Sequence, residues 1–163
     1  QGQPLTLTRY EYLLLKTLHI LSSTLLFGTG LGSAYYAWRA WRSGRVAVIA
    51  STFRHVVAAD WLFTTPCALL QPASGLAMVH LAGWPLGHTW LLATLLLYAL
   101  AGLCWLPVVW LQIRVRDLAV QAERAGTPLP AVAGRYMACW FALGWPAFVA
   151  FLAIFFLMVN KPL

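Results

Sequence analysis

An uninterrupted apolar stretch near the middle of the chain decides the fold class: residues 90–113 are WLLATLLLYALAGLCWLPVVWLQI. This stretch contains no Asp, Glu, Lys or Arg. A helix of about 20 apolar residues is needed to cross a hydrocarbon core about 30 Å thick. The stretch therefore predicts a transmembrane helix, and it indicates an integral membrane protein rather than a water-soluble one.

Three further stretches of this kind lie along the 163-residue chain. The composition agrees with them, since 61% of the residues are apolar and only 9% are charged, against about 25% charged in soluble domains. We therefore expect an all-α integral membrane protein, a single four-transmembrane-helix bundle that occupies residues 1–163. The expected spans cover residues 12–37, 56–81, 90–113 and 137–159. The third helix is expected to continue past the membrane until Gly126, Pro128 and Pro130 stop it.

The positive charges predict how the bundle is oriented, because cytoplasmic connections carry an excess of Lys and Arg. On one side we expect only Arg9, Lys16 and Lys161. Both termini are therefore predicted on the outer, periplasmic side of a bacterial inner (plasma) membrane. Because the basic residues flank apolar stretches, they indicate topology and no nucleic-acid partner. The opposite side holds the remaining arginines, in two connections: Arg39, Arg42, Arg45 and Arg54, then Arg114, Arg116, Arg124 and Arg135.

Polar residues within the spans mark the faces that point into the bundle. On the first span, Lys16, His19 and Ser23 share a face. Counted from the outer helix ends at 1.5 Å per residue, His19, Tyr98 and Gln71 lie roughly 11, 12 and 15 Å deep. We expect these three residues to meet in the outer half of the bundle. On the second span one helical stripe carries Asp60, Thr64, Cys67, Gln71, Ser74 and Met78.

His19 is the candidate centre of this polar level. An imidazole at that depth either hydrogen-bonds a neighbouring Tyr or Gln, binds haem iron or carries a proton. As a metal ligand, His19 would hold a haem iron from one side, with Met78, His80 or no residue on the other. Lys16 is placed to pair with a haem propionate or to extend to the lipid headgroups. A two-haem cytochrome is disfavoured because it needs four axial ligands, and no second histidine lies at the depth of His19.

Two other features of the spans have a structural interpretation that we favour over a functional one. Asp60 is expected to form an ion pair with Arg54, Arg39 or Arg42, and the alternative is a proton relay. The GxxxG pair at residues 28–32 predicts close helix packing. Its alternative is a flat surface for a cofactor ring.

Short motifs along most of the chain resemble one family of four-helix membrane proteins. In LKTLHI (15–20), DWLFT (60–64), QPASG (71–75) and GWPA (144–147), the chain resembles the predicted integral membrane family called domain of unknown function 2269. This resemblance implies the fold and no particular activity. The LKTLHI motif is also similar to HemJ-type protoporphyrinogen oxidases and to the membrane part of CopD-like copper proteins. In the HemJ-type group the matching His is a haem ligand, which implies that role for His19.

These observations lead to two functional hypotheses. The first is a small membrane protein that binds one b-type haem at His19, with Lys16, Gln71, Tyr98 and Met78 around the cofactor, and that exchanges electrons with a quinone or a partner complex. The second is a non-catalytic accessory subunit of a larger respiratory or photosynthetic membrane complex, because ionisable groups are few. A transporter is less favoured, since internal repeats are not evident. Beyond the lipid bilayer, we therefore expect other membrane subunits as partners.

Overall fold

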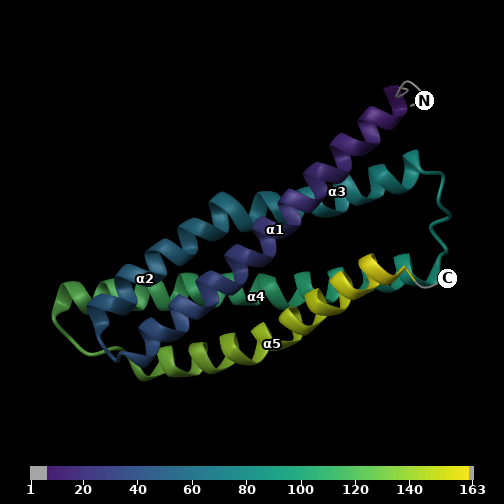
Figure 1. Cartoon of the computed structure of the whole chain (residues 1–163). Coiled ribbons are helices and arrows are strands. Elements are labelled where there is room, and N and C mark those ends of the chain that lie inside the picture. Colours follow the sequence, from purple (N-terminus) through teal and green to yellow (C-terminus); the bar gives the residue numbers. More distant parts are fainter. Residues whose placement is uncertain (1–6, 162–163) are drawn as a thin grey trace.

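The structure is a computed structural model that describes residues 7–161, and its regular elements in that range are all helices (Figure 1). Because α2, η1 and α3 follow one another without a break, the chain forms four long helices, each long and apolar enough to cross a membrane. The protein is thus an all-helical, multi-pass integral membrane protein, which confirms the predicted fold class. The elements are α1 (Leu7–Arg42), α2 (Val46–Ala59), the π-helical segment η1 (Asp60–Thr64), α3 (Thr65–Leu81), α4 (Thr89–Ala125) and α5 (Ala131–Asn160).

The helices extend beyond the predicted spans, most clearly in the second. That helix was expected at 56–81 but begins at Val46, so the predicted long connection shrinks to residues 43–45. The third helix was expected to continue until Gly126. This is confirmed, because α4 ends at Ala125 and Gly126 adopts the left-handed conformation (φ +65°) that commonly stops a helix. With 37 residues, α4 is about 56 Å long and exceeds the thickness of the hydrocarbon core.

The four helices form an open bundle. α1 packs along α3 and α2, α2 packs along α4, and α4 packs along α5. Figure 1 shows the helices close together where α2 begins and further apart toward the end where α3 meets the connection to α4. α1 begins and α5 ends at this wider end, so both lie on one side of the membrane, as the even number of spans requires.

The buried core lies at the narrow end of the bundle. Ile49 and Phe53 of α2 are almost completely buried there, although the predicted spans left them outside the membrane. The arginines that were assigned to the two connections also lie toward this end, but all of them except Arg45 belong to the helices themselves. The members of the core are Ala37, Ile49, Ala50, Phe53, Val56, Leu111, Val115, Ala119, Met137 and Trp140.

The π-helical segment η1 has a local cause in the sequence. Pro66 lacks a backbone N–H, and its ring displaces the carbonyl group four residues earlier. The chain forms a wider turn instead, in which the N–H of Thr65 bonds to the carbonyl oxygen of Asp60, five residues back. Single π-helical turns occur frequently at functional sites. This one carries Asp60 and Thr64, and both side chains are buried.

Candidate functional site

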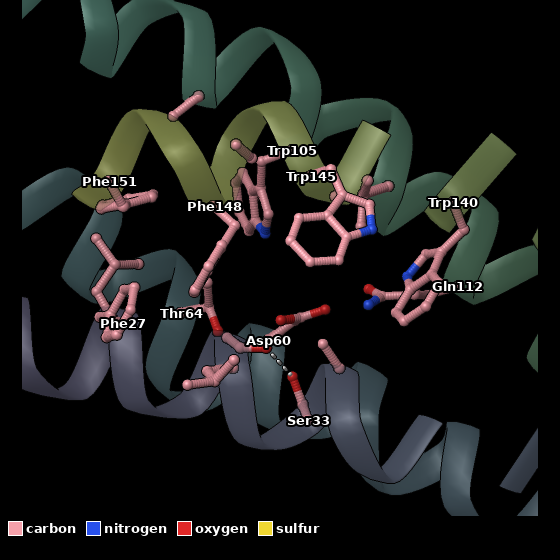
Figure 2. Close-up of a pocket in the computed structure, with 18 of the residues that line it drawn as sticks. Phe27, Ser33, Asp60, Thr64, Trp105, Gln112, Trp140, Trp145, Phe148 and Phe151 are labelled. Atoms are coloured by element: carbon pink, nitrogen blue, oxygen red, sulfur yellow. Dashed lines mark hydrogen bonds between the residues drawn. The ribbon is translucent and has the colours of Figure 1, made fainter. Parts of the chain in front are cut away.

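A crevice of about 580 Å³ separates α1 from α5 (Figure 2). The two helices form its walls, and η1, α3 and α4 contribute the rest of its surface. Small-molecule sites typically measure about 300–1,000 Å³, so the crevice has room for an apolar molecule of ordinary size. Aromatic and small residues dominate the lining, among them Phe27, Gly30, Trp105, Trp140, Gly144, Trp145, Phe148 and Phe151.

Asp60 makes part of the crevice polar. Its side chain is only 3% exposed, and Figure 2 shows its carboxylate extending into the crevice near Trp145. In the amide orientation that satisfies both neighbours, Gln112 donates to Oδ2 of Asp60 at 2.5 Å and accepts from Nε1 of Trp140 at 3.2 Å. This chain of contacts joins η1, α4 and α5.

Thr64, one turn after Asp60, adds a second polar group. Its Oγ1 is buried and has no hydrogen-bond partner within residues 7–161. A buried polar atom without a partner costs about 1–3 kcal/mol. Because a carboxylate can accept about four hydrogen bonds and Gln112 supplies one, Asp60 also has capacity left. The polar part of the crevice can therefore bind a further hydrogen-bonding group.

The crevice opens sideways toward the lipid. At the end of the crevice away from Gln112, Phe27 of α1 stacks on Phe148 of α5 with ring centroids 5.7 Å apart. Phe27 also meets Phe155 edge-on, with ring centroids 5.3 Å apart. This aromatic contact bridges the two walls of the crevice. Large side chains on the lining are themselves exposed, namely Leu31, Tyr35, Leu106, Phe141 and Trp145.

The expected ion pair of Asp60 is wrong. Arg54 instead places Nη2 at 2.9 Å from Oε2 of Glu123 on α4. Within residues 7–161 no basic side chain lies within 4.0 Å of the Asp60 carboxylate. The reason is geometric: Arg54 and Asp60 belong to one continuous helix, and six residues at about 100° each make them point in different directions.

The expected close packing at the GxxxG pair does not occur within the chain. A Cβ atom added at Gly28 or Gly32 would meet no heavy atom within 4 Å. The same holds for Gly30, which lines the crevice. Close approach occurs instead at Gly75 of α3, where an added Cβ would lie 3.2 Å from Cε1 of His19. The glycines of α1 thus leave open space rather than a helix contact.

His19 belongs to a second polar cluster, which joins α1 to α3. Its Nδ1 lies 2.8 Å from Oγ of Ser74. Gln71 donates through Nε2 to the carbonyl oxygen of His19 at 2.7 Å and also to Oγ of Ser22. The structure therefore brings the predicted residues His19 and Gln71 together. The serine of α1 that contacts Gln71 is Ser22. The predicted Ser23 donates only to the carbonyl oxygen of Ile20 in its own helix.

The partner of Ser74 determines which nitrogen of His19 carries the proton. A hydroxyl has one hydrogen, and Oγ of Ser74 directs it to the carbonyl oxygen of Leu70 at 2.7 Å. Ser74 therefore accepts from Nδ1–H of His19, and Nε2 keeps the lone pair of the neutral ring. A second partner of this kind is what orients a metal-binding imidazole.

The remaining predicted site residues make no hydrogen bond to this cluster among the described residues. Tyr98 lines the crevice and donates to the carbonyl oxygen of Ala68 at 2.5 Å. Lys16 and His80 are exposed and Met78 is half-buried. In the part of the chain that the structure describes, no three His, Cys, Asp or Glu side chains come together in a way that could hold a metal ion.

The sequence interpretation missed the polar part of the crevice. Asp60 was noticed as an acid within a span but was assigned a structural role. Gln112 and Trp140 were not considered, because they fall near the predicted span ends. The available signal was the pairing of Asp60 with Thr64 four residues later, which places both on one face.

Comparisons with known proteins agree with this architecture. No curated protein and no solved structure matches the chain. The model of one family, described as predicted integral membrane protein (DUF2269), matches residues 13–162 and thus nearly the whole sequence. The chain therefore belongs to the DUF2269 family of predicted integral membrane proteins.

Proposed function

We propose that the protein binds a lipophilic molecule with a polar head, which enters the crevice between α1 and α5 from the bilayer. One observation carries the proposal: the buried carboxylate of Asp60 faces an aromatic-lined crevice and has no ionic partner within residues 7–161. Ionisable residues are costly within a membrane, and they usually mark the binding sites or pathways of substrates.

The two parts of the crevice suit the two parts of such a molecule. The apolar body packs on the aromatic walls, which include Trp105 and Phe148. The polar head bonds to Asp60, whose carboxylate can accept more hydrogen bonds than Gln112 supplies. This spare capacity favours a bound molecule that has a hydrogen-bond donor at this position.

Filling the crevice tests this proposal. Gly30→Leu places a large side chain in the lining, whereas Gly28→Leu adds the same side chain outside it. With N-phenyl-1-naphthylamine as a neutral apolar probe, energy transfer from tryptophan reports binding to the protein in detergent. We expect Gly30→Leu to lose at least half of the transfer and Gly28→Leu to retain it. Equal transfer in both variants would remove the basis of the proposal.

Haem binding at His19, with electron transfer to a quinone or a partner complex, is a second candidate function. The specific observation in its favour is the Nδ1–H bond to Ser74, which leaves Nε2 as the ligating atom. In this candidate Nε2 of His19 would hold the haem iron from one side, with Met78, His80 or no residue on the other. A bound haem would supply one-electron chemistry, and Ser74 would fix the orientation of the imidazole.

An absorption spectrum of the protein purified after expression with ample haem tests this candidate. A Soret band is expected in the wild type, lost in His19→Ala and retained in His80→Ala, with unchanged helical circular dichroism in all three. A colourless wild-type protein contradicts haem binding and leaves the crevice proposal unaffected.

The accessory-subunit hypothesis draws support from the open glycine surface of α1. Gly28 and Gly32 leave room for a neighbouring helix, and small residues are the usual contact points between membrane helices. Native electrophoresis of gently solubilised membranes tests it. Migration within a large assembly, reversed by Gly28→Leu, is the expected result, and migration at the size of the isolated chain would contradict it.

A further inference from the structure

We propose that the molecule bound in the crevice carries a positive charge, and that Asp60 is its counter-ion. This inference rests on the proposed function and specifies the chemical class of the ligand: a lipophilic cation, such as an amphiphilic amine or a quaternary ammonium compound. It assigns a binding role to Asp60 and to the indole rings around it.

The first step of the argument is the charge balance of the crevice. No Lys, Arg or His is found among the residues that line it. Arg54, the nearest arginine along the helix, is bound to Glu123. The side chains beside the carboxylate of Asp60 are therefore neutral, namely the amide of Gln112 and the hydroxyl of Thr64. A buried charge without an opposite charge is strongly unfavourable. A cation in the crevice removes this penalty without any change in the protein.

The second step is the chemistry of the walls. Indole and phenol rings attract cations through the negative potential of their faces, and recognition of quaternary ammonium groups is the usual function of such aromatic surroundings. Figure 2 shows Trp105, Trp140 and Trp145 around the space into which Asp60 extends. Tyr98 also lines the crevice. A carboxylate among several aromatic rings favours a cationic head over a neutral one.

The third step is access. The dry core seals the narrow end of the bundle, where Phe53 and Val56 lie within two turns of Asp60. The exposed aromatic rim lies on the lipid side of the crevice. A small hydrated ion has no path from that direction, whereas a cation with an apolar body enters by the same route as a lipid. The geometry thus selects for an ion that is itself soluble in the membrane.

Two probes of matched size and opposite charge test the inference. Tetraphenylphosphonium and tetraphenylborate are both lipophilic, so a difference between them reports the charge of the site. Binding to the full chain in detergent is measured by isothermal titration calorimetry against protein-free micelles, with decylubiquinone as a neutral probe. We expect the phosphonium to bind at least tenfold more tightly than the borate.

Three variants locate the effect. Asp60→Asn preserves the shape of the side chain and should weaken phosphonium binding at least tenfold, while Asp60→Glu should retain part of it. Asp117→Asn makes the same chemical change at an acid outside the crevice that is bound to Arg116, and it should leave binding unchanged. If Asp60→Asn does not yield a monodisperse protein, the comparison of the two wild-type affinities and a loss of affinity in Trp145→Leu decide the question.

The outcomes separate this inference from the function on which it rests. Equal binding of all three probes, unaffected by Asp60→Asn, would overturn the cation inference and leave a site for neutral lipophiles. Tight binding of decylubiquinone alone would likewise overturn it in favour of a quinone. If none of the probes binds to the wild-type protein, both the inference and the proposed function fail.

Discussion

At the scale of single residues, Gln112 holds the polar part of the crevice together. Its amide is the group that both donates to Asp60 and accepts from Trp140. Loss of the amide therefore removes a hydrogen bond from two buried polar groups, one of them an acid.

We accordingly expect Gln112→Leu to lower the free energy of unfolding by about 1–3 kcal/mol. Thermal unfolding in detergent, followed by circular dichroism, measures the change. Gln121→Leu is the matched control, because Gln121 is exposed on the same helix and surface substitutions usually change stability by less than about 0.5 kcal/mol. Equal melting temperatures for the two variants would show that the amide is not needed to stabilise Asp60.

At the scale of the elements, the glycines of α1 are free to accept a side chain. Glycine in a helix costs about 0.5–1 kcal/mol relative to alanine, and a methyl group at Gly28 or Gly32 meets nothing within 4 Å. We expect Gly28→Ala and Gly32→Ala each to stabilise the protein by roughly that amount in chemical unfolding. Gly75→Ala should bring no gain, since its methyl group would press on His19. Destabilisation by Gly28→Ala would instead indicate a helix contact with another subunit.

The early start of α2 leads to a prediction about the narrow end of the bundle. Phe53 is fully buried in the core there. Large-to-small changes of buried Phe cost about 3–5 kcal/mol, and we expect Phe53→Ala to fall in this range. Phe141→Ala serves as the control, because Phe141 is exposed on α5. A loss below about 1 kcal/mol for Phe53→Ala would mean that the core at α2 contributes little to stability.

The elements also show what hydropathy can and cannot predict. Residues 90–113 contain no charge, and the helix there was identified directly from its length and composition. Residues 46–55 carry Arg54 and His55, which lower the hydropathy and concealed a helix whose other face is buried. The helix over these residues depends on tertiary packing, which hydropathy averaged along the sequence does not detect. The predicted end of the third helix at Gly126, in contrast, was correct, because a glycine in the left-handed conformation ends a helix locally.

At the scale of the whole molecule, the site depends on how the helices diverge. The stripe of polar residues on the second span was correctly placed, but it serves two different neighbours. Gln71 and Ser74 face α1, whereas Asp60 contacts α4 and Tyr98 of α4 reaches the backbone of α3. Depth alone put His19, Gln71 and Tyr98 at one level, yet it gave no information on which pairs of helices meet. The crevice arises from that separation and has no sequence motif of its own.

The connection between α3 and α4 and the end of α5 lie at one end of the molecule. Lys161 places its Nζ 5.0 Å from the ring centre of Trp84 and 5.9 Å from that of Trp90. These contacts join the end of α5 to the connection between α3 and α4 and to the start of α4. They lie at the wide end of the bundle, away from the closely packed core. The connection between α4 and α5 lies at that narrow end, so the two connections should be on opposite sides of the membrane.

The arginines predict which side of the membrane each connection faces, and cysteine labelling of intact cells tests this prediction. The connection near Gly87 belongs to the end with few positive charges, and the connection near Thr127 belongs to the arginine-rich end. In a background with Cys139→Ser, since Cys139 is the exposed cysteine of α5, we expect a membrane-impermeant maleimide to modify Gly87→Cys before lysis and Thr127→Cys only after it. Thr127 is preferable to Gly126, whose positive φ would be strained by a side chain. Labelling of Thr127→Cys alone would invert the orientation, and labelling of both in intact cells would contradict four spans.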